Sequence, residues 1–111
     1  MLFRSTGTPY NDAMEAVALT RVFGRRVVPV DSIKGAIGHT LGAAGAFEAI
    51  LCARVLAEGR IPPTAGLETP DPACDGLDLV VGTARAQAVE VAVSSSSGFA
   101  GTNAALVLGR A

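Results

Sequence analysis

The stretch SIKGAIGHTLGAAG, residues 32–45, holds the only lysine and the only histidine of the chain, Lys34 and His39. Glycine recurs throughout this stretch and an apolar segment follows it, so we expect a turn that opens into a helix. A charged amine and a titratable imidazole are costly to hold beside an apolar segment unless they have specific work there. The stretch is therefore the candidate site of the chain, either a reaction centre or the remnant of one.

Length and composition limit the class of protein. The 111 residues suffice for one domain. Half of them are hydrophobic and 17% are charged, against a typical charged share of about 25%. So few charges indicate that part of the surface is covered by another chain, by a further part of the same protein or by a membrane. The net charge of -1 and the absence of a basic run exclude nucleic-acid binding as the expected function.

The two cysteines, Cys52 and Cys74, form neither a C-x-x-C pair nor a Cys/His ligand spacing, so we expect no metal site. Two cysteines also make no disulfide framework. Arg4 interrupts a very short apolar start, which does not read as a signal peptide. These features lead us to expect a cytoplasmic protein.

The first half of the chain predicts two helices around a strand. We expect a helix over residues 11–23 that ends at Gly24, then a short strand within residues 25–31. Pro29 argues against pairing of that strand on both sides. A second helix is expected over residues 38–57, apolar nearly all round, which predicts burial between layers or in a bilayer. Its charges, its histidine and the lack of an aromatic belt argue against the bilayer.

The second half predicts a proline-rich connection and three strands. The connection spans residues 61–72, and a loop of that length often serves a site. Strands are expected over residues 77–81, 89–93 and 104–108, with a turn of small residues over 94–103 between the last two. The small-residue loops lie at the ends of expected strands or the starts of helices, where α/β proteins place their sites.

Taken together, these loops resemble the C-terminal half of the β-ketoacyl synthases, the condensing enzymes of fatty acid and polyketide synthesis. The matching stretches follow the family's order and spacing along essentially the whole chain: TGTP (6–9) with Asn11, Asp12 and Glu15, Lys34 with GHTLGAAG (38–45), IPPT (61–64), ETPDP (68–72) and GFAGTN (98–103). The resemblance implies an α/β fold: the C-terminal half of a thiolase-like fold, with layered helices on a mixed sheet, incomplete at its N-terminus. Residues 1–111 would form one partial domain of this kind.

The resemblance also implies roles for individual residues. The second family histidine falls on His39, which would donate a hydrogen bond to the malonyl thioester carbonyl and stabilise the enolate formed on loss of carbon dioxide. The family lysine falls on Lys34, which would hold the geometry of His39. The family glutamate that pairs with this lysine falls on Glu15, with Asp12 beside it, because a buried ammonium needs a carboxylate.

Further site residues, the reaction and the partners follow from the same resemblance. Phe99 would gate the acyl pocket and Gly98–Phe99 would contribute to the oxyanion hole, supported by Thr6, Thr8 and Asn103. The reaction is an acyl transfer, the decarboxylative condensation of malonyl-carrier protein with an acyl thioester. Its substrates arrive on the phosphopantetheine of acyl carrier protein, so no separate cofactor is expected. The implied partners are acyl carrier protein and an N-terminal ketosynthase half or a ketosynthase subunit, with a dimer as a further option.

The chain departs from the family where catalysis needs it most. The first family histidine stands two residues before the Thr-Gly-Thr, and here Arg4 occupies that position. An arginine does not act as the same neutral donor. The family's nucleophilic cysteine lies in the N-terminal half, and neither cysteine of this chain matches it. Ala100 replaces a usual glycine at a turn that needs a positive φ, at roughly 1 kcal/mol.

These departures leave three interpretations. The first is the C-terminal part of a condensing enzyme that is inactive as a lone chain. The second is a non-catalytic partner subunit that resembles a chain-length factor, and the third is a degenerate fragment. Retention of Lys34 and His39 favours the first, because a purely structural subunit has no need of them.

Overall fold

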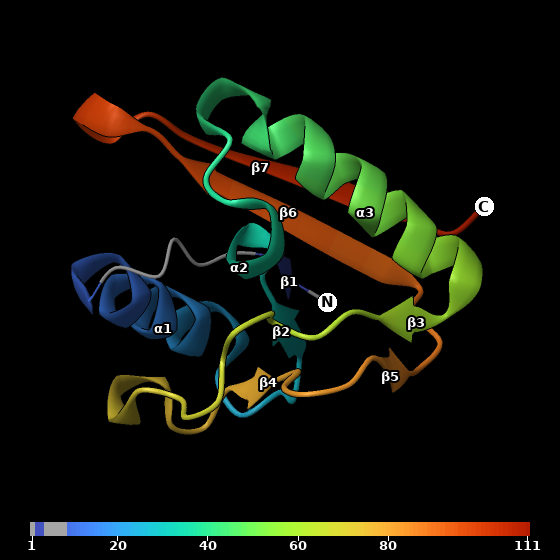
Figure 1. Cartoon of the computed structure of the whole chain (residues 1–111), viewed down its shortest axis with the longest axis horizontal. Coiled ribbons are helices and arrows are strands. Elements are labelled where there is room, and N and C mark those ends of the chain that lie inside the picture. Colours follow the sequence, from blue (N-terminus) through green and yellow to red (C-terminus); the bar gives the residue numbers. More distant parts are fainter. Residues whose placement is uncertain (1, 4–8) are drawn as a thin grey trace.

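The computed structural model describes residues 2–3 and 9–111, which form a mixed sheet with helices packed against it (Figure 1). The five-stranded sheet has the order β4-β2-β1-β6-β7. Its strands are β1 (Leu2–Phe3), β2 (Pro29–Asp31), β4 (Asp78–Leu79), β6 (Val91–Ser97) and β7 (Asn103–Gly109). The pairings from β4 to β6 are parallel and β7 pairs antiparallel to β6, so the expected mixed sheet is confirmed.

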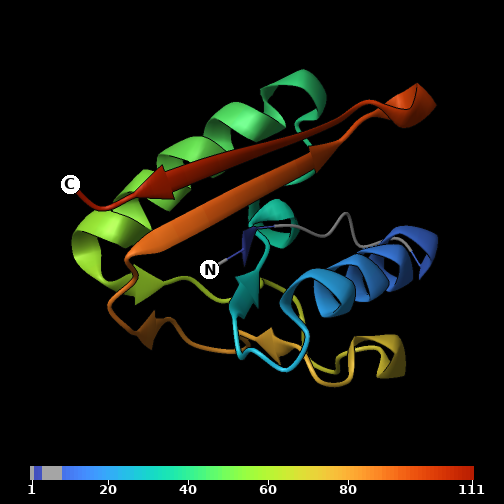
Figure 2. The same cartoon turned by 180° about the vertical axis from the view of Figure 1, so that it is seen from behind.

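The first expected helix is present as α1 (Pro9–Phe23). Pro9 stands at its first position, where the missing N–H leaves no helical hydrogen bond unmade. Gly24 ends it with a φ of 59°, and its N–H donates to the carbonyl of Thr20 at 2.8 Å. In both views α1 lies alongside the loop that carries the short helix η2 (Pro72–Cys74) (Figures 1 and 2).

The prediction about Pro29 is wrong. Strand β2 is shorter than expected, yet it is paired on both sides, to β1 and to β4. Pro29 is its first residue, a position where the missing donor is tolerated. The whole strand is buried, including Asp31 at its end.

The predicted helix over residues 38–57 begins later than expected. The chain forms α2 (Lys34–Ile37), then η1 (Leu41–Ala43) and only then α3 (Ala44–Glu58). Gly38 has a φ of 76° with ψ of 177°, and Leu41 also has a positive φ, so no continuous helix can run through them. No helix in the described part of the chain is long and apolar enough to cross a bilayer.

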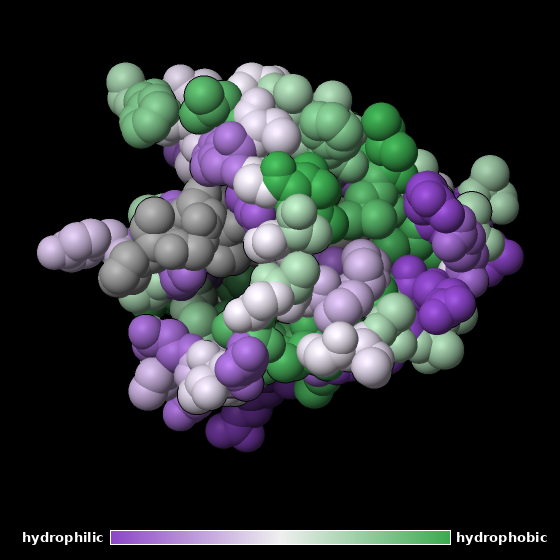
Figure 3. Space-filling model, in the orientation of Figure 1, coloured by the Kyte–Doolittle hydropathy of each residue, from purple (hydrophilic) through white to green (hydrophobic). Residues whose placement is uncertain are grey.

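Helix α3 is buried on one side only. That side packs along the β6–β7 hairpin in both views (Figures 1 and 2). Phe47 and Ile50 on its other side are exposed, and Figure 3 shows apolar residues gathered over this helix. The expectation of burial all round is therefore wrong for this chain by itself. The core beneath α3 consists of Cys52, Val55, Leu56, Ile61, Val80, Val89 and Ala92.

The two long strands of the second half differ from expectation at one end. Residues 94–97 continue β6 and pair with β7 from Asn103 to Leu106, so they are strand and not turn. The turn itself holds η3 (Phe99–Gly101), which projects at the end of the hairpin (Figure 2). The remaining strands, β3 (Arg60–Ile61) and β5 (Arg85–Ala86), form a separate antiparallel pair.

The positive φ expected at Ala100 is confirmed, with φ 60° and ψ 27°. A Cβ is strained in this left-handed region, so the Ala100→Gly variant should have a free energy of unfolding about 1 kcal/mol higher. Urea denaturation measures the change. The matched control is Ala105→Gly in β7, which should lower the stability by about 0.5–1 kcal/mol. Equal losses in both variants would contradict the strain at Ala100.

Candidate functional site

Lys34 forms a buried ion pair with Glu48. The Nζ of Lys34 lies 2.7 Å from Oε1 of Glu48, and the two side chains are only 11% and 4% exposed. The second oxygen of Glu48 accepts a hydrogen bond from Oγ of Ser94 at 3.0 Å. Because these residues belong to α2, α3 and β6, one carboxylate ties three segments together.

The expected partner of Lys34, Glu15, is therefore incorrect. Glu15 is buried on α1, where its Oε1 accepts a hydrogen bond from the side-chain amide of Asn11 at 2.6 Å. The sequence held a signal for the true partner. Glu48 is the only acidic residue inside a long apolar segment, and a buried acid there needs a cation, of which the nearby Lys34 is the sole amine.

His39 lies in the turn between α2 and η1 and is exposed in this chain. Its Nδ1 accepts a hydrogen bond from the backbone N–H of Leu41 at 3.0 Å. A ring nitrogen that accepts carries no proton, so the neutral imidazole holds its proton on Nε2. His39 therefore presents a hydrogen-bond donor at Nε2.

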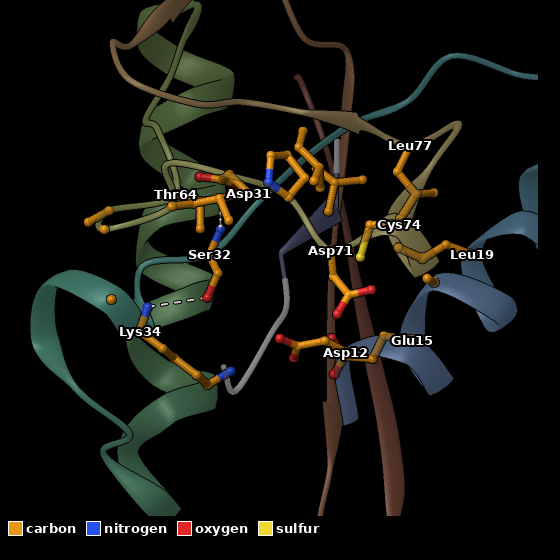
Figure 4. Close-up of a pocket in the computed structure, with 18 residues that line it drawn as sticks. Asp12, Glu15, Leu19, Asp31, Ser32, Lys34, Thr64, Asp71, Cys74 and Leu77 are labelled. Atoms are coloured by element: carbon orange, nitrogen blue, oxygen red, sulfur yellow. Dashed lines mark hydrogen bonds between the residues drawn. The ribbon is translucent and has the colours of Figure 1, made fainter. Parts of the chain in front are cut away.

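A cavity of about 270 Å³ opens beside Lys34 (Figure 4). Asp12 and Glu15 from α1 and Asp71 from the proline-rich loop line it, and in the close-up Asp71 lies opposite the two residues of α1. The loop expected to serve a site thus does line a cavity. His39 is not among the lining residues. The predicted site residues therefore fall into two groups. Asp12, Glu15 and Lys34 line the cavity, whereas His39 and the residues at 98–103 lie at the turns outside it.

The β6–β7 turn holds the rest of the predicted group. Phe99 is 94% exposed, so it is no core aromatic of this chain. The N–H of Gly98 donates to the carbonyl of Thr102 at 2.7 Å. Asn103 closes the turn: its Oδ1 accepts from Oγ of Ser97 at 2.6 Å and its Nδ2 donates to the carbonyl of Gly101 at 3.2 Å.

Two of the predicted supporting residues, Thr6 and Thr8, lie outside the described residues, as does Arg4. Within residues 2–3 and 9–111, no group of three or more His, Cys, Asp or Glu side chains is placed to hold a metal ion.

Neither cysteine has the surroundings of a nucleophile. Burial, together with the charges of Asp31 and Glu48, raises the pKa of Cys52 to about 11. Burial also raises the pKa of Cys74, with Asp12 as the next contribution. Because the thiolate is the reactive form, both environments disfavour reaction.

Asp31, in the cavity wall, was not predicted as a site residue from the sequence. Asp31 ends β2 and is 1% exposed, and neither of its carboxylate oxygens has a hydrogen-bond partner among the described residues. Burial raises the pKa of Asp31 to about 8. Beside it, the N–H of Ser32 donates to Oγ1 of Thr64 at 3.0 Å, and Oγ of Ser32 accepts from the N–H of Lys34 at 3.3 Å.

Helix α2 is held directly against the proline-rich loop. A Cβ placed on Gly35 would lie 1.9 Å from the carbonyl oxygen of Ala65, so only glycine fits this contact. The loop and helix α2 are thus packed backbone to backbone at Gly35, the residue next to Lys34.

The Gly35→Ala variant should therefore lose about 1–3 kcal/mol or more of its free energy of unfolding, because backbone atoms must move to admit the methyl group. Chemical denaturation followed by circular dichroism measures the loss. The Gly42→Ala variant is the matched control, because nothing lies within 4 Å of its Cβ position. If Gly35→Ala loses no more stability than Gly42→Ala, the backbone at Ala65 moves aside at no cost and the close contact does not restrict residue 35.

Comparisons with known proteins give a consistent result. The family described as "Beta-ketoacyl synthase, C-terminal domain" matches residues 3–68. The tetracenomycin polyketide synthase ketoacyl synthase alpha subunit of Streptomyces glaucescens is 50% identical over 107 residues, which are 95% of this chain and 25% of that protein. The 3-oxoacyl-[acyl-carrier-protein] synthase 2 of Synechocystis is 45% identical over 103 residues, which are 91% of this chain and 24% of that protein.

A solved structure agrees with these relatives. The ishigamide ketosynthase/chain length factor superimposes with a TM-score of 0.93 at 38% identity, over 99% of this chain and 28% of that chain. The thiolase-like fold expected from the sequence is thereby confirmed. This chain spans about a quarter of the length of the curated relatives that it matches.

Proposed function

Because this chain belongs to the β-ketoacyl synthase family, as its C-terminal domain, we propose that it forms the C-terminal part of a β-ketoacyl-[acyl carrier protein] synthase. That enzyme would condense malonyl-carrier protein with an acyl thioester in fatty acid or polyketide synthesis. The observation that carries the proposal is the buried pair of Lys34 and Glu48, which brackets the turn of His39. The free thiols Cys52 and Cys74 fit a reducing, cytoplasmic location.

His39 supplies the hydrogen-bond donor that stabilises the enolate of the proposed reaction. When the malonyl thioester loses carbon dioxide, the bond to the carboxylate breaks and its electron pair passes to the thioester oxygen as an enolate. The Nε2–H of His39 donates to that oxygen, as an oxyanion hole does. The hydrogen bond from the N–H of Leu41 to Nδ1 keeps the ring in this tautomer. The enolate carbon then attacks the acyl thioester, whose thiolate leaves.

The Lys34–Glu48 pair positions His39. Lys34 begins α2 on one side of the turn and Glu48 lies in α3 on the other, so their 2.7 Å contact fixes both ends of the segment that carries the imidazole. Ser94 extends the connection to β6, whose turn carries Phe99. A gate at Phe99 and a donor at His39 would in this way share one rigid frame.

The partners proposed are acyl carrier protein and the remaining part of a ketosynthase or a ketosynthase subunit. The exposed apolar side chains Phe47, Ile50 and Val107 need a cover, and so does Phe99 at the end of the hairpin. The relatives are about four times as long as this chain, which supports a cover made by the rest of such an enzyme.

A chimera tests the proposal. This chain replaces the matching segment of the tetracenomycin ketoacyl synthase alpha subunit, and β-keto product is measured with malonyl- and acyl-carrier protein. We expect Arg4→His with Ser5→Gly to give an active chimera, and His39→Ala in that background to lower its rate about a hundredfold to a thousandfold. The lone chain should form no product. A folded chimera without activity, or one indifferent to His39→Ala, would refute the proposal.

Arg4 in the place of the first family histidine favours a second function, that of a non-catalytic partner subunit. For this function the chimera with Arg4→His stays inactive, while a complex with a ketosynthase subunit forms and alters the length of its products. Size-exclusion chromatography and product analysis distinguish the two. A degenerate fragment would instead bind hydrophobic dyes and aggregate in the absence of either effect.

A further inference from the structure

We propose that strand β7 pairs along its open edge with β7 of a second copy of this chain, so that two copies form a two-fold symmetric dimer. The two strands run antiparallel and join the sheets of both copies edge to edge. The interface uses neither His39 nor any residue that lines the cavity, and the proposal does not rest on the condensing function.

The outer edge of β7 (Asn103–Gly109) is accessible. The sheet order β4-β2-β1-β6-β7 places β7 last, and no strand of the described residues lies beyond it (Figure 2). Helix α3 leaves this edge uncovered. Leu106 shares a face of the sheet with its cross-strand partner Ser94, which donates to Glu48 of α3, yet Leu106 is 46% exposed. A further strand can therefore approach β7 from this side.

The register of the hairpin shows which backbone groups of β7 point to the open edge. The N–H of Gly98 donates to the carbonyl of Thr102 at one end of the β6–β7 ladder, and the N–H of Arg110 donates to the carbonyl at residue 90 at the other end. Hydrogen-bonded and non-hydrogen-bonded pairs alternate in an antiparallel ladder, so the even-numbered residues of β7 bond to β6. The outward N–H and C=O groups are those of Asn103, Ala105, Val107 and Gly109.

Strand β7 lacks the features that keep an edge strand from pairing. It is seven residues long, and its sequence NAALVLG contains no charged residue and no proline. Its register against β6 is regular from Asn103 to Gly109, so no bulge bends it. Natural edge strands are commonly short, charged, bulged or interrupted by proline, because an open row of N–H and C=O groups recruits other strands. The edge of β7 therefore has the properties of a pairing surface.

The strand matches a second copy of itself. In the register that sets Leu106 opposite its own counterpart, Asn103 of each copy faces Gly109 of the other. Ala105 likewise faces Val107, so every outward N–H and C=O group finds a partner. A shift of the strands by two residues leaves one of the four outward-facing residues unpaired in each copy. Self-pairing in the first register thus satisfies the edge completely.

Side chains and charges favour the same arrangement. Leu106 and Val107 are exposed, and pairing brings both against the edge of the second copy. The nearest charged residue, Arg110, falls opposite Thr102, so no like charges meet. The other edge strand of the sheet, β4, has only two residues. Association through the one long edge therefore closes at two copies.

Sedimentation equilibrium of the full chain tests the proposal, and we expect a reversible monomer–dimer equilibrium. Val107→Pro removes one outward N–H from each copy and keeps the hydrogen bonds to β6, because proline is tolerated at an open edge. It should weaken dimerisation at least about tenfold. Val107→Thr is the matched control, since it keeps the N–H and the branched side chain, and it should dimerise like the natural sequence. Ile50→Ser, on the exposed side of α3, should also leave the dimer unchanged.

A cysteine variant tests the register and does not depend on how well Val107→Pro folds. In a Cys74→Ser background, Leu106→Cys sets two thiols opposite each other, at a Cα separation of about 4.5 Å that a disulfide spans. Mild oxidation with copper phenanthroline should give a covalent dimer. Ala104→Cys is the control and should not cross-link, because residue 104 of one copy faces residue 108 of the other. The remaining thiol, Cys52, is buried.

Four results would overturn the proposal. The first is a chain that stays monomeric, and the second is growth beyond two copies. The third is a dimer that Ile50→Ser abolishes and Val107→Pro leaves intact, which would place the contact on α3. The fourth is cross-linking of Ala104→Cys as readily as of Leu106→Cys.

Discussion

The free energy of unfolding should fall as the pH rises from about 4 to about 8, and Asp31→Asn should remove most of that fall. Burial raises the pKa of Asp31 from 3.8 to about 8 in the folded chain. Between these values the folded chain holds a proton that the unfolded chain has released. The free energy of unfolding then falls by about 1.4 kcal/mol per pH unit. The total loss between the two pKa values amounts to several kcal/mol.

Urea denaturation at several pH values measures this slope. The contribution of Asp31 is fully present below pH 3.8 and is lost as the pH rises through about 8. At pH about 8 the Asp31→Asn variant should be the more stable protein, because its amide carries no charge to bury. Asp75→Asn, an exposed acid replaced in the same way, should keep the slope of the natural sequence. If the free energy of unfolding of Asp31→Asn still falls with pH in the same way, a group other than Asp31 causes the fall.

The elements that could be predicted from sequence are those set by local chemistry. Helix α1 begins two residues before its expected start at residue 11 and ends before Gly24, as expected. Strand β7 and the start of β6 follow from their apolar residues, whereas the serines at 94–97 were expected as a turn and extend β6. In each case the deciding interactions lie within a few residues of one another, so a sequence pattern can reveal them.

The elements that could not be predicted depend on distant contacts. The largely apolar pattern over residues 38–57 predicts one helix, although Gly38 and Leu41 interrupt it with positive φ values. The burial of Asp31 comes from the position of β2 between β1 and β4, which no property of residues 29–31 announces. A short strand becomes a central one only when its neighbours from elsewhere in the chain are in place.

The partner of Lys34 was missed for a related reason. The resemblance implied Glu15, which follows the TGTP stretch (6–9) closely in sequence, whereas the contact is set by how α3 packs against α2. The sequence therefore predicts which residues belong to the candidate site better than it predicts which of them are in contact. The sequence offers a signal for Glu48, as the one acid inside a long apolar segment, but none for Ser94, which the folded structure brings to Glu48.

Removal of the Glu48 charge should be among the most damaging single changes in the described residues. In Glu48→Gln the ammonium of Lys34 stays buried without a counter-ion, which should lower the free energy of unfolding by about 3–5 kcal/mol. Domains of this size have about 5–15 kcal/mol in total, so the variant should be close to unfolding at ambient temperature. The exposed pair of Arg54 and Glu58 provides the control, because Glu58→Gln should cost about 0.5 kcal/mol or less.

A double variant separates the structural role of the pair from its proposed role in catalysis. Lys34→Met with Glu48→Gln removes both charges and should recover most of the stability, because a neutral pair carries no desolvation penalty. In the active chimera the same double variant should stay slow, since the stretch that carries His39 has lost the contact between its two ends. Recovery of the rate together with the stability would show that the pair serves the fold alone. A Glu48→Gln variant as stable as Glu58→Gln would show that the ammonium reaches solvent, and the assigned geometry of the site would then be wrong.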